Sequence, residues 1–123
     1  MRLFARAARR LISFPLMSTS GSHEAVVREI RLEKAGALAR VAEALERALG
    51  ELTRAEAALS GAGRATSALL ARRDDCLSEA AERLWYLVIQ REALGLMRHE
   101  TVFDVYRVPR EVRLAMGPRR PVR

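Results

Sequence analysis

The stretch that decides the fold is residues 84–89, Leu84-Trp85-Tyr86-Leu87-Val88-Ile89, six consecutive apolar residues. Taken alone, a run rich in aromatic and β-branched types is also compatible with a buried strand. Its flanks favour a helix, because no Gly or Pro occurs from residue 65 to residue 94 and most residues there are strong helix formers. We therefore expect a helix from about Arg64 to Leu94, with residues 84–89 at the centre of the core and covered on more than one side.

Leucine at every seventh position is typical of the contact seam of a coiled coil. The second predicted helix has this spacing at Leu70, Leu77 and Leu84. An earlier segment has it at Leu38, Leu45, Leu52 and Leu59. That segment predicts a first long helix, with Ser22 as its N-cap. The intervening loop, Ser60-Gly61-Ala62-Gly63, is short, and a short loop between two helices favours an antiparallel hairpin.

Two short helices are predicted after the hairpin. Gly95 ends the second long helix, and a third helix runs from about Glu100 to Tyr106. A fourth begins at Pro109, which suits a first helical position, and ends at Gly117. We expect both to fold back over residues 84–89. The predicted fold class is therefore all-α: a long antiparallel helical hairpin capped by two short C-terminal helices.

The formal net charge of +7 is concentrated at the two ends of the chain. Residues 1–16 hold four arginines and no acid, and residues 107–123 hold six arginines and one glutamate. Residues 17–106 hold 12 basic and 14 acidic residues, so the body is close to neutral. We expect a single helical domain at 22–117, a disordered or extraneous basic extension at 1–21, and a basic disordered tail at 118–123.

Three interpretations of residues 1–16 stay open. The segment has the basic start of a signal peptide, but its apolar run is short and interrupted by Ser13 and Pro15. Its apolar residues also have roughly helical spacing, which fits a targeting or membrane-surface amphipath. The third interpretation is that translation starts at Met17, so that these residues do not belong to the working protein.

The sequence contains no complete catalytic, metal or nucleotide-binding motif, and we expect no enzyme activity and no cofactor. The single cysteine, Cys76, excludes an internal disulfide, and its acidic neighbours Asp74 and Asp75 disfavour a reactive thiolate. We interpret it as a half-buried helix residue. No stretch approaches the ~20 apolar residues of a membrane span. The expected location is a reducing, cytoplasmic one.

The leucine seam is the leading candidate for a partner surface. A two-helix hairpin buries little, and the half of it nearer the loop has little else to cover it. We therefore expect self-association, as a homodimer or other homo-oligomer, or the binding of a partner helix. The candidate seam residues are Leu38, Leu45, Leu49, Leu52, Leu59, Leu70 and Leu77.

Nucleic-acid binding is the alternative function. Residues 102–116 have the order of a helix-turn-helix motif, a short helix, a turn and an arginine-bearing helix. Against it, the usual turn glycine is Arg107, the expected small residue is Phe103, and the last helix is only about two turns long. We regard a helical cap as the better interpretation. The candidate phosphate contacts are Arg110, Arg113, Arg119 and Arg120.

A polar cluster is predicted near the Gly95 turn, formed by Arg91, His99, Glu100 and Asp104. Arg91 continues the leucine heptad, so it points inward and needs an acidic partner, for which we expect Asp104 or Glu100. A metal site is not expected, because it needs at least three ligands at suitable spacing. A structural ion pair is preferred over a ligand anchor.

Two runs of the C-terminal half resemble a small uncharacterised bacterial protein family. They are Leu-Trp-Tyr-Leu-Val-Ile-Gln-Arg-Glu-Ala-Leu-Gly-Leu at residues 84–96 and Val-Tyr-Arg-Val-Pro-Arg-Glu-Val at residues 105–112. The resemblance covers roughly residues 24–117. It implies an all-helical fold and a bacterial cytoplasmic setting, and it supplies no catalytic residues.

Overall fold

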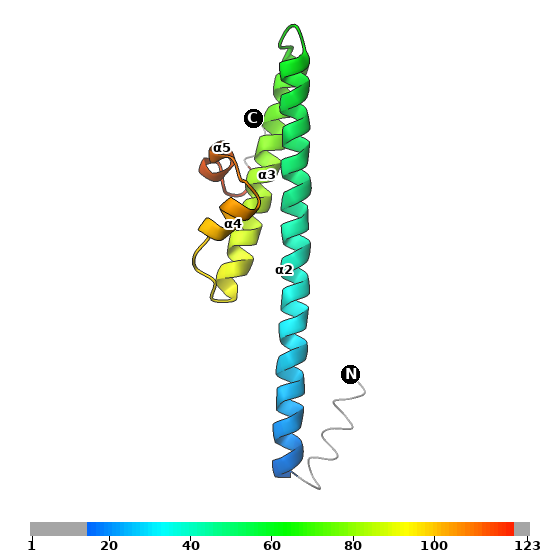
Figure 1. Ribbon diagram of the computed structural model, residues 1–123, viewed down its shortest axis with the longest axis vertical. Coiled ribbons are helices and arrows are strands. Elements are labelled where there is room, and N and C mark those ends of the chain that lie inside the picture. The colour runs from blue at the N-terminus through cyan, green and yellow to red at the C-terminus, as the bar shows by residue number, and fades with distance from the viewer. Residues whose placement is uncertain (1–14, 120–123) are drawn as a thin grey trace. The chain divides into compact units, whose positions relative to one another are not determined.

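The computed structural model describes the backbone of residues 15–119 and the side chains from residue 21 onward. Four helices and no strand occur in this part of the chain: α2 (Pro15–Gly61), α3 (Ser67–Ala93), α4 (Glu100–Val105) and α5 (Arg110–Leu114) (Figure 1). The chain divides into two compact units, one ending at Ala37 and the other beginning at Leu38. In the part of the first unit that the structure describes, α2 is the only element. No helix among the described residues is long and apolar enough to cross a membrane.

The second unit contains the predicted hairpin. From Leu38 onward, α2 lies beside α3, and the two short helices lie on α3 (Figure 1). The all-α fold, the hairpin and the two C-terminal helices are thus confirmed. The core combines alanines and leucines of the long helices with valines of the C-terminal segment: Ala42, Leu45, Ala48, Leu52, Ala80, Ala81, Leu84, Leu87, Val88, Val102, Val108 and Val112. Alternating Leu and Ala along α2 let the two helices approach closely.

The start of α2 differs from the prediction. Ser22 was expected to cap the helix, but the helix begins at Pro15, and Ser22 lies inside it. Residues 15–21, expected to lie outside the fold, are therefore helical, while residues 1–14 lie outside the described part. A proline fits the first helical turn, and Ser or Gly costs at most about 1 kcal/mol each in a helix. Helix propagation is cooperative, so residues 18–22 do not end it.

Helix α3 has well-defined ends. The Thr66 hydroxyl accepts a hydrogen bond from the Leu69 amide at 3.2 Å, so the helix begins at Ser67, three residues after the predicted start. At the other end Gly95 has φ +84°. Its amide donates to the Glu92 carbonyl at 2.9 Å, and the Leu96 amide donates to the Arg91 carbonyl at 2.9 Å. This pair of bonds is a Schellman motif, and it confirms Gly95 as the residue that ends the helix.

A second Schellman motif ends α4. The Val108 amide donates to the Phe103 carbonyl at 2.9 Å, and the Arg107 amide donates to the Asp104 carbonyl at 3.3 Å. Arg107 has φ +49°, in the left-handed region that favours glycine. The turn delivers Val108 to the core, where its side chain is buried. Burial of the following valine thus holds an arginine in a conformation that its Cβ disfavours.

The stretch at residues 84–89 is less completely covered than predicted. Leu84, Leu87 and Val88 are buried, and Trp85 is half-buried. Tyr86 is 39% exposed and Ile89 is 43% exposed, so the expectation that both belong to the core was wrong. The reason is geometric: α2 covers one side of α3 and the short helices cover another, which leaves the third open (Figure 1). The rings of Trp85 and Tyr86 contact each other there, with centroids 5.3 Å apart.

Candidate interaction surfaces

The seven leucines of the predicted partner seam differ in accessibility. Leu45 and Leu52 are 0% and 2% exposed, because they pack against α3 inside the hairpin. Both are therefore already used within the chain. Leu38, Leu49, Leu59 and Leu77 are half-buried. Leu70 is 46% exposed and is the member of the seam that stands open to solvent.

A second apolar surface lies on α2 between residues 21 and 37. Val26 and Val27 are half-buried, Ile30 is 42% exposed, and Leu32 is 68% exposed. Among the residues whose side chains the structure describes, the buried core and the hydrophobic residues packed on it begin at Leu38. A single helix cannot bury its own apolar side chains, since they project outward from its axis. This surface was not among the predicted site residues.

The sequence does contain the signal for this surface. Positions 27, 30, 34, 37 and 41 follow the alternating three- and four-residue spacing of a coiled-coil seam, occupied by Val27, Ile30, Lys34, Ala37 and Val41. A search for leucine at every seventh position does not detect this surface, because no leucine occupies the seam between residues 21 and 37. Residues 21–37 also hold three acidic and three basic residues, so the segment has no net charge.

Arg119, a predicted phosphate contact, is held by an acidic row on α3. Its guanidinium lies 2.7 Å from the Glu79 carboxylate and 3.8 Å from that of Asp75. Its backbone amide donates to the Glu82 carboxylate at 3.0 Å. Aspartate and glutamates at spacings of four and three residues share one face of the helix. These contacts leave Arg119 less able to bind a phosphate than a solvated tail residue.

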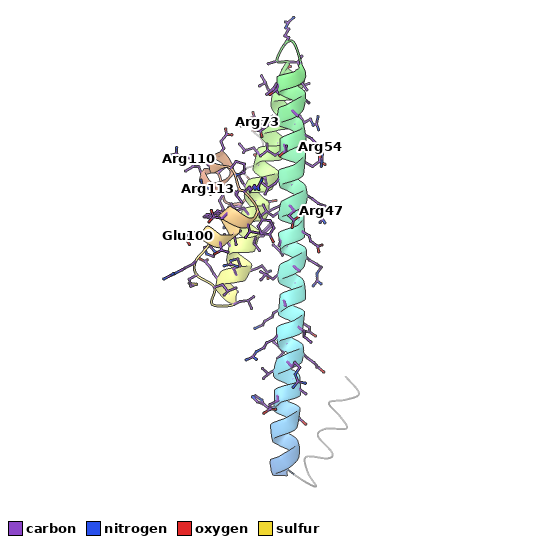
Figure 2. The ribbon with its side chains drawn as sticks, viewed as in Figure 1. Arg47, Arg54, Arg73, Glu100, Arg110 and Arg113 are labelled. Carbon is purple, nitrogen blue, oxygen red and sulfur yellow. The ribbon has the colours of Figure 1, made fainter. Side chains whose placement is uncertain are left out.

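Two other predicted nucleic-acid contacts, Arg110 and Arg113, belong to α5. Arg110 and Arg113 lie exposed on α5 (Figure 2). The Arg113 guanidinium carbon stands 5.5 Å from the centre of the Phe103 ring, a cation–π distance. Arg120 lies outside the described residues. Helix α5 has only five residues, which is short for a helix that reads a DNA groove.

Arg73 of α3 contacts both α2 and α5 (Figure 2). It forms ion pairs with Glu111 of α5, with Glu56 of α2 at 3.5 Å and with Asp74 at 3.7 Å. The hydrogen bond to Glu111 raises the pKa of Arg73 above its ordinary value. Sequence analysis missed this group, because its members are 17 and 38 residues apart in the chain. The arrangement is a staple that joins α3 to α2 and to α5.

A weaker pair on the outer face of α2 joins Arg54 to Glu51, one turn away, at 2.5 Å (Figure 2). The hydrogen bond from Arg54 lowers the pKa of Glu51. Both side chains are exposed, so water screens the pair.

The predicted polar cluster forms in part. Arg91 and His99 meet, with Arg91 Nε 3.5 Å from His99 Nδ1, and Glu92 joins them at 3.2 Å from His99 Nε2. Arg91 does not pair with Glu100 or Asp104, so that prediction was wrong; its guanidinium donates to the Arg98 carbonyl at 2.8 Å. The Gly95 turn brings residues 98 and 99 back beside the end of α3, while Glu100 and Asp104 are exposed on α4.

Among the described residues, no group of three or more His, Cys, Asp or Glu side chains is placed to hold a metal ion. Cys76 is a free, half-buried thiol that packs against the core. The surfaces that remain are apolar or are networks of ion pairs.

Comparison with known proteins gives a family and no activity. The model of a family of unknown function (DUF6665) matches residues 17–120. No curated protein and no solved structure matches the chain. The expected resemblance to an uncharacterised family is thus confirmed, with a match that extends beyond residues 24–117 at both ends.

Proposed function

The chain belongs to DUF6665, a family of unknown function, and we propose that it is a non-enzymatic helical module that self-associates through α2. One observation carries the proposal: α2 continues its apolar seam through Val27 and Ile30, where Ile30 is 42% exposed. Pairing with another helix would bury these side chains.

Two physical arguments support this choice. Burial of apolar surface contributes about 25 cal/mol per Å², so covering Val27 and Ile30 of both copies favours association. Most of the stability of a helix in a protein also comes from packing of its apolar face rather than from helix propensity. A partner helix along residues 21–37 would therefore stabilise the helix itself as well as cover its apolar side.

The test is the solution mass of the full chain, measured by light scattering over a range of concentrations. We expect a dimer that dissociates on dilution. Ile30→Glu places a charge in the seam and should give a monomer. Leu32→Glu is the matched control, because Leu32 is 68% exposed and lies about 160° around the helix from Ile30. A monomeric wild-type chain at every concentration would refute the proposal.

Nucleic-acid binding remains the alternative, and light scattering distinguishes it from self-association. Its support is the exposed Arg110 on α5; the contacts of Arg119 with α3 weaken it. Adding a short DNA duplex at two salt concentrations should leave the mass unchanged. A complex that forms only at low salt and is lost in Arg110→Ala would favour the alternative.

A further inference from the structure

We infer that two copies of α2 pair antiparallel through residues 21–37, with the two-fold axis between Arg28 and Glu29; this rests on the proposed self-association. In this register Val27 of each copy packs against Ile30 of the other. Glu24 of each copy then lies beside Arg31 of the other. The partner that covers the apolar seam is a second copy of this chain, because the charged residues beside the seam are complementary between two copies.

The apolar layers set which side chains face the partner. In an antiparallel pair, each step toward the C-terminus of one copy is a step toward the N-terminus of the other. Placing Val27 opposite Ile30 therefore also places Lys34 opposite His23. Val27 is half-buried and Ile30 is 42% exposed in the single chain. The central two layers are therefore apolar, and the polar layers lie outside them.

The flanking charges favour this register. Glu24 and Arg31 occupy the same flank of the seam and are both exposed. Antiparallel pairing brings equivalent flanks together, which gives two Glu24–Arg31 pairs by symmetry. Lys34 is at nearly the same height as Glu24 of the second copy, so its ammonium group also has an acidic partner.

A parallel pair fits the same residues poorly. It would place Lys34 opposite Lys34 and His23 opposite His23 in the seam. Its flanks would place Val26 beside Arg31 and Glu33 beside Leu38, so that no opposite charges meet. The two Lys34 ammonium groups facing each other in the seam disfavour this orientation.

Neighbouring antiparallel registers are disfavoured as well. If the two-fold axis is shifted toward the C-terminus by one heptad of pairing, Arg31 of one copy faces Arg31 of the other, and Glu33 faces Glu33. A shift in the opposite direction places the two Glu24 side chains beside each other. A larger shift toward the C-terminus would need Val41 in the interface. Val41 already packs against the hairpin core, so it is not available.

Disulfide trapping tests the orientation. In a Cys76→Ala background, chains carrying Val27→Cys or Ile30→Cys are oxidised separately and as an equal mixture prepared under reducing conditions. Antiparallel pairing predicts that the mixed disulfide forms at least about tenfold faster than either homodisulfide, because only residues 27 and 30 of different copies meet at the Cα distance of a disulfide. Intact mass distinguishes the products.

The outcomes separate the inference from the function on which it rests. A dimer by light scattering that gives homodisulfides of each variant alone would overturn the antiparallel orientation. A dimer that gives no disulfide would overturn this surface. A monomer in every measurement would overturn self-association itself.

Charge reversal provides a test that needs no cysteine. Glu24→Arg or Arg31→Glu alone should weaken the dimer about tenfold, since each change affects two symmetric pairs. The double variant should restore the wild-type dissociation constant. A merely structural role would not be rescued in this way, because residues 24 and 31 are two turns apart within one helix. Additive weakening in the double variant would overturn the register.

Discussion

Helix α2 carries an apolar stripe along two stretches that differ in exposure. Between residues 38 and 61 the stripe faces α3, and Leu45 and Leu52 are almost completely buried. Between residues 21 and 37 the leucine heptad does not continue, because its positions hold Glu24 and Arg31; the apolar residues there are offset from it, and one of them, Ile30, is 42% exposed. Apolar residues at helical spacing thus form a core in one stretch and an open surface in the other. Periodicity states that a side chain needs cover, and it does not state which element supplies it.

The largest expected effect compares one residue from each stretch. Leu45→Ala should lower the free energy of unfolding by about 2–5 kcal/mol, because it leaves a cavity in the hairpin. Ile30→Ala should lower it by less than about 1 kcal/mol in a dilute, monomeric sample, since Ile30 is already partly exposed. Urea unfolding followed by circular dichroism measures both. Equal losses would mean that the two stretches do not differ in packing.

The next effect concerns the staple on the hairpin. Arg73→Met should lower the free energy of unfolding by about 1 kcal/mol, because it removes ion pairs that join α3 to Glu56 and Glu111. The loss should shrink at high salt, since these pairs are partly exposed to solvent. Arg72→Met is the control, at an exposed neighbouring position. Urea titrations at two salt concentrations measure the difference; an equal loss in the control would argue against the staple.

Glycine replacements sharpen the comparison further. A Cβ at position 50 would meet the Arg54 side chain no closer than 3.6 Å, so Gly50→Ala should raise the free energy of unfolding by about 1 kcal/mol through helix propensity. A Cβ at position 21 meets nothing within 4 Å. Gly21→Ala should therefore raise local helix content without changing the unfolding midpoint of the hairpin. Thermal unfolding and amide exchange distinguish the two effects. A shifted midpoint in Gly21→Ala would show that the two stretches unfold together.

The smallest expected effect lies where the short helices close on α3. Arg107→Gly should raise the free energy of unfolding by about 0.5 kcal/mol, because glycine adopts φ +49° without strain but loses more chain entropy. Arg110→Gly, at the first residue of α5, should instead destabilise the protein. Chemical denaturation of the two variants gives the sign of each change. A loss of stability in Arg107→Gly would mean that the arginine side chain itself stabilises the turn.

Most of the fold was predictable from local signals. Heptad leucines predicted two long helices, the glycine loop predicted their separation, and Gly95 predicted the end of α3. The start of α2 was not, because Ser22 is a good cap in isolation and the helix continues past it to Pro15. Cap preference is a local term, and helix extension depends on the sum over many residues.

The candidate surfaces were less predictable. The sequence identified the seam leucines as a partner surface, whereas Leu45 and Leu52 are enclosed by the chain's own second helix. Arg119 was expected in a solvated tail, whereas it contacts acids on α3. Arg91 was expected to pair with Asp104 or Glu100, whereas it contacts a backbone carbonyl and the His99 ring. In each case the partner is brought close by a turn or by packing of distant segments.

The amino-acid pattern is sufficient to place the helices, their order and the apolar side of each, because helix propensity and periodicity act over a few residues. Packing between the helices determines which apolar residues are covered, how Arg73 joins Glu56 to Glu111, and which side of residues 84–89 is exposed. These features depend on contacts between segments far apart in the chain. A side chain is buried only when a second surface packs against it, and the pattern of one segment describes only its own surface.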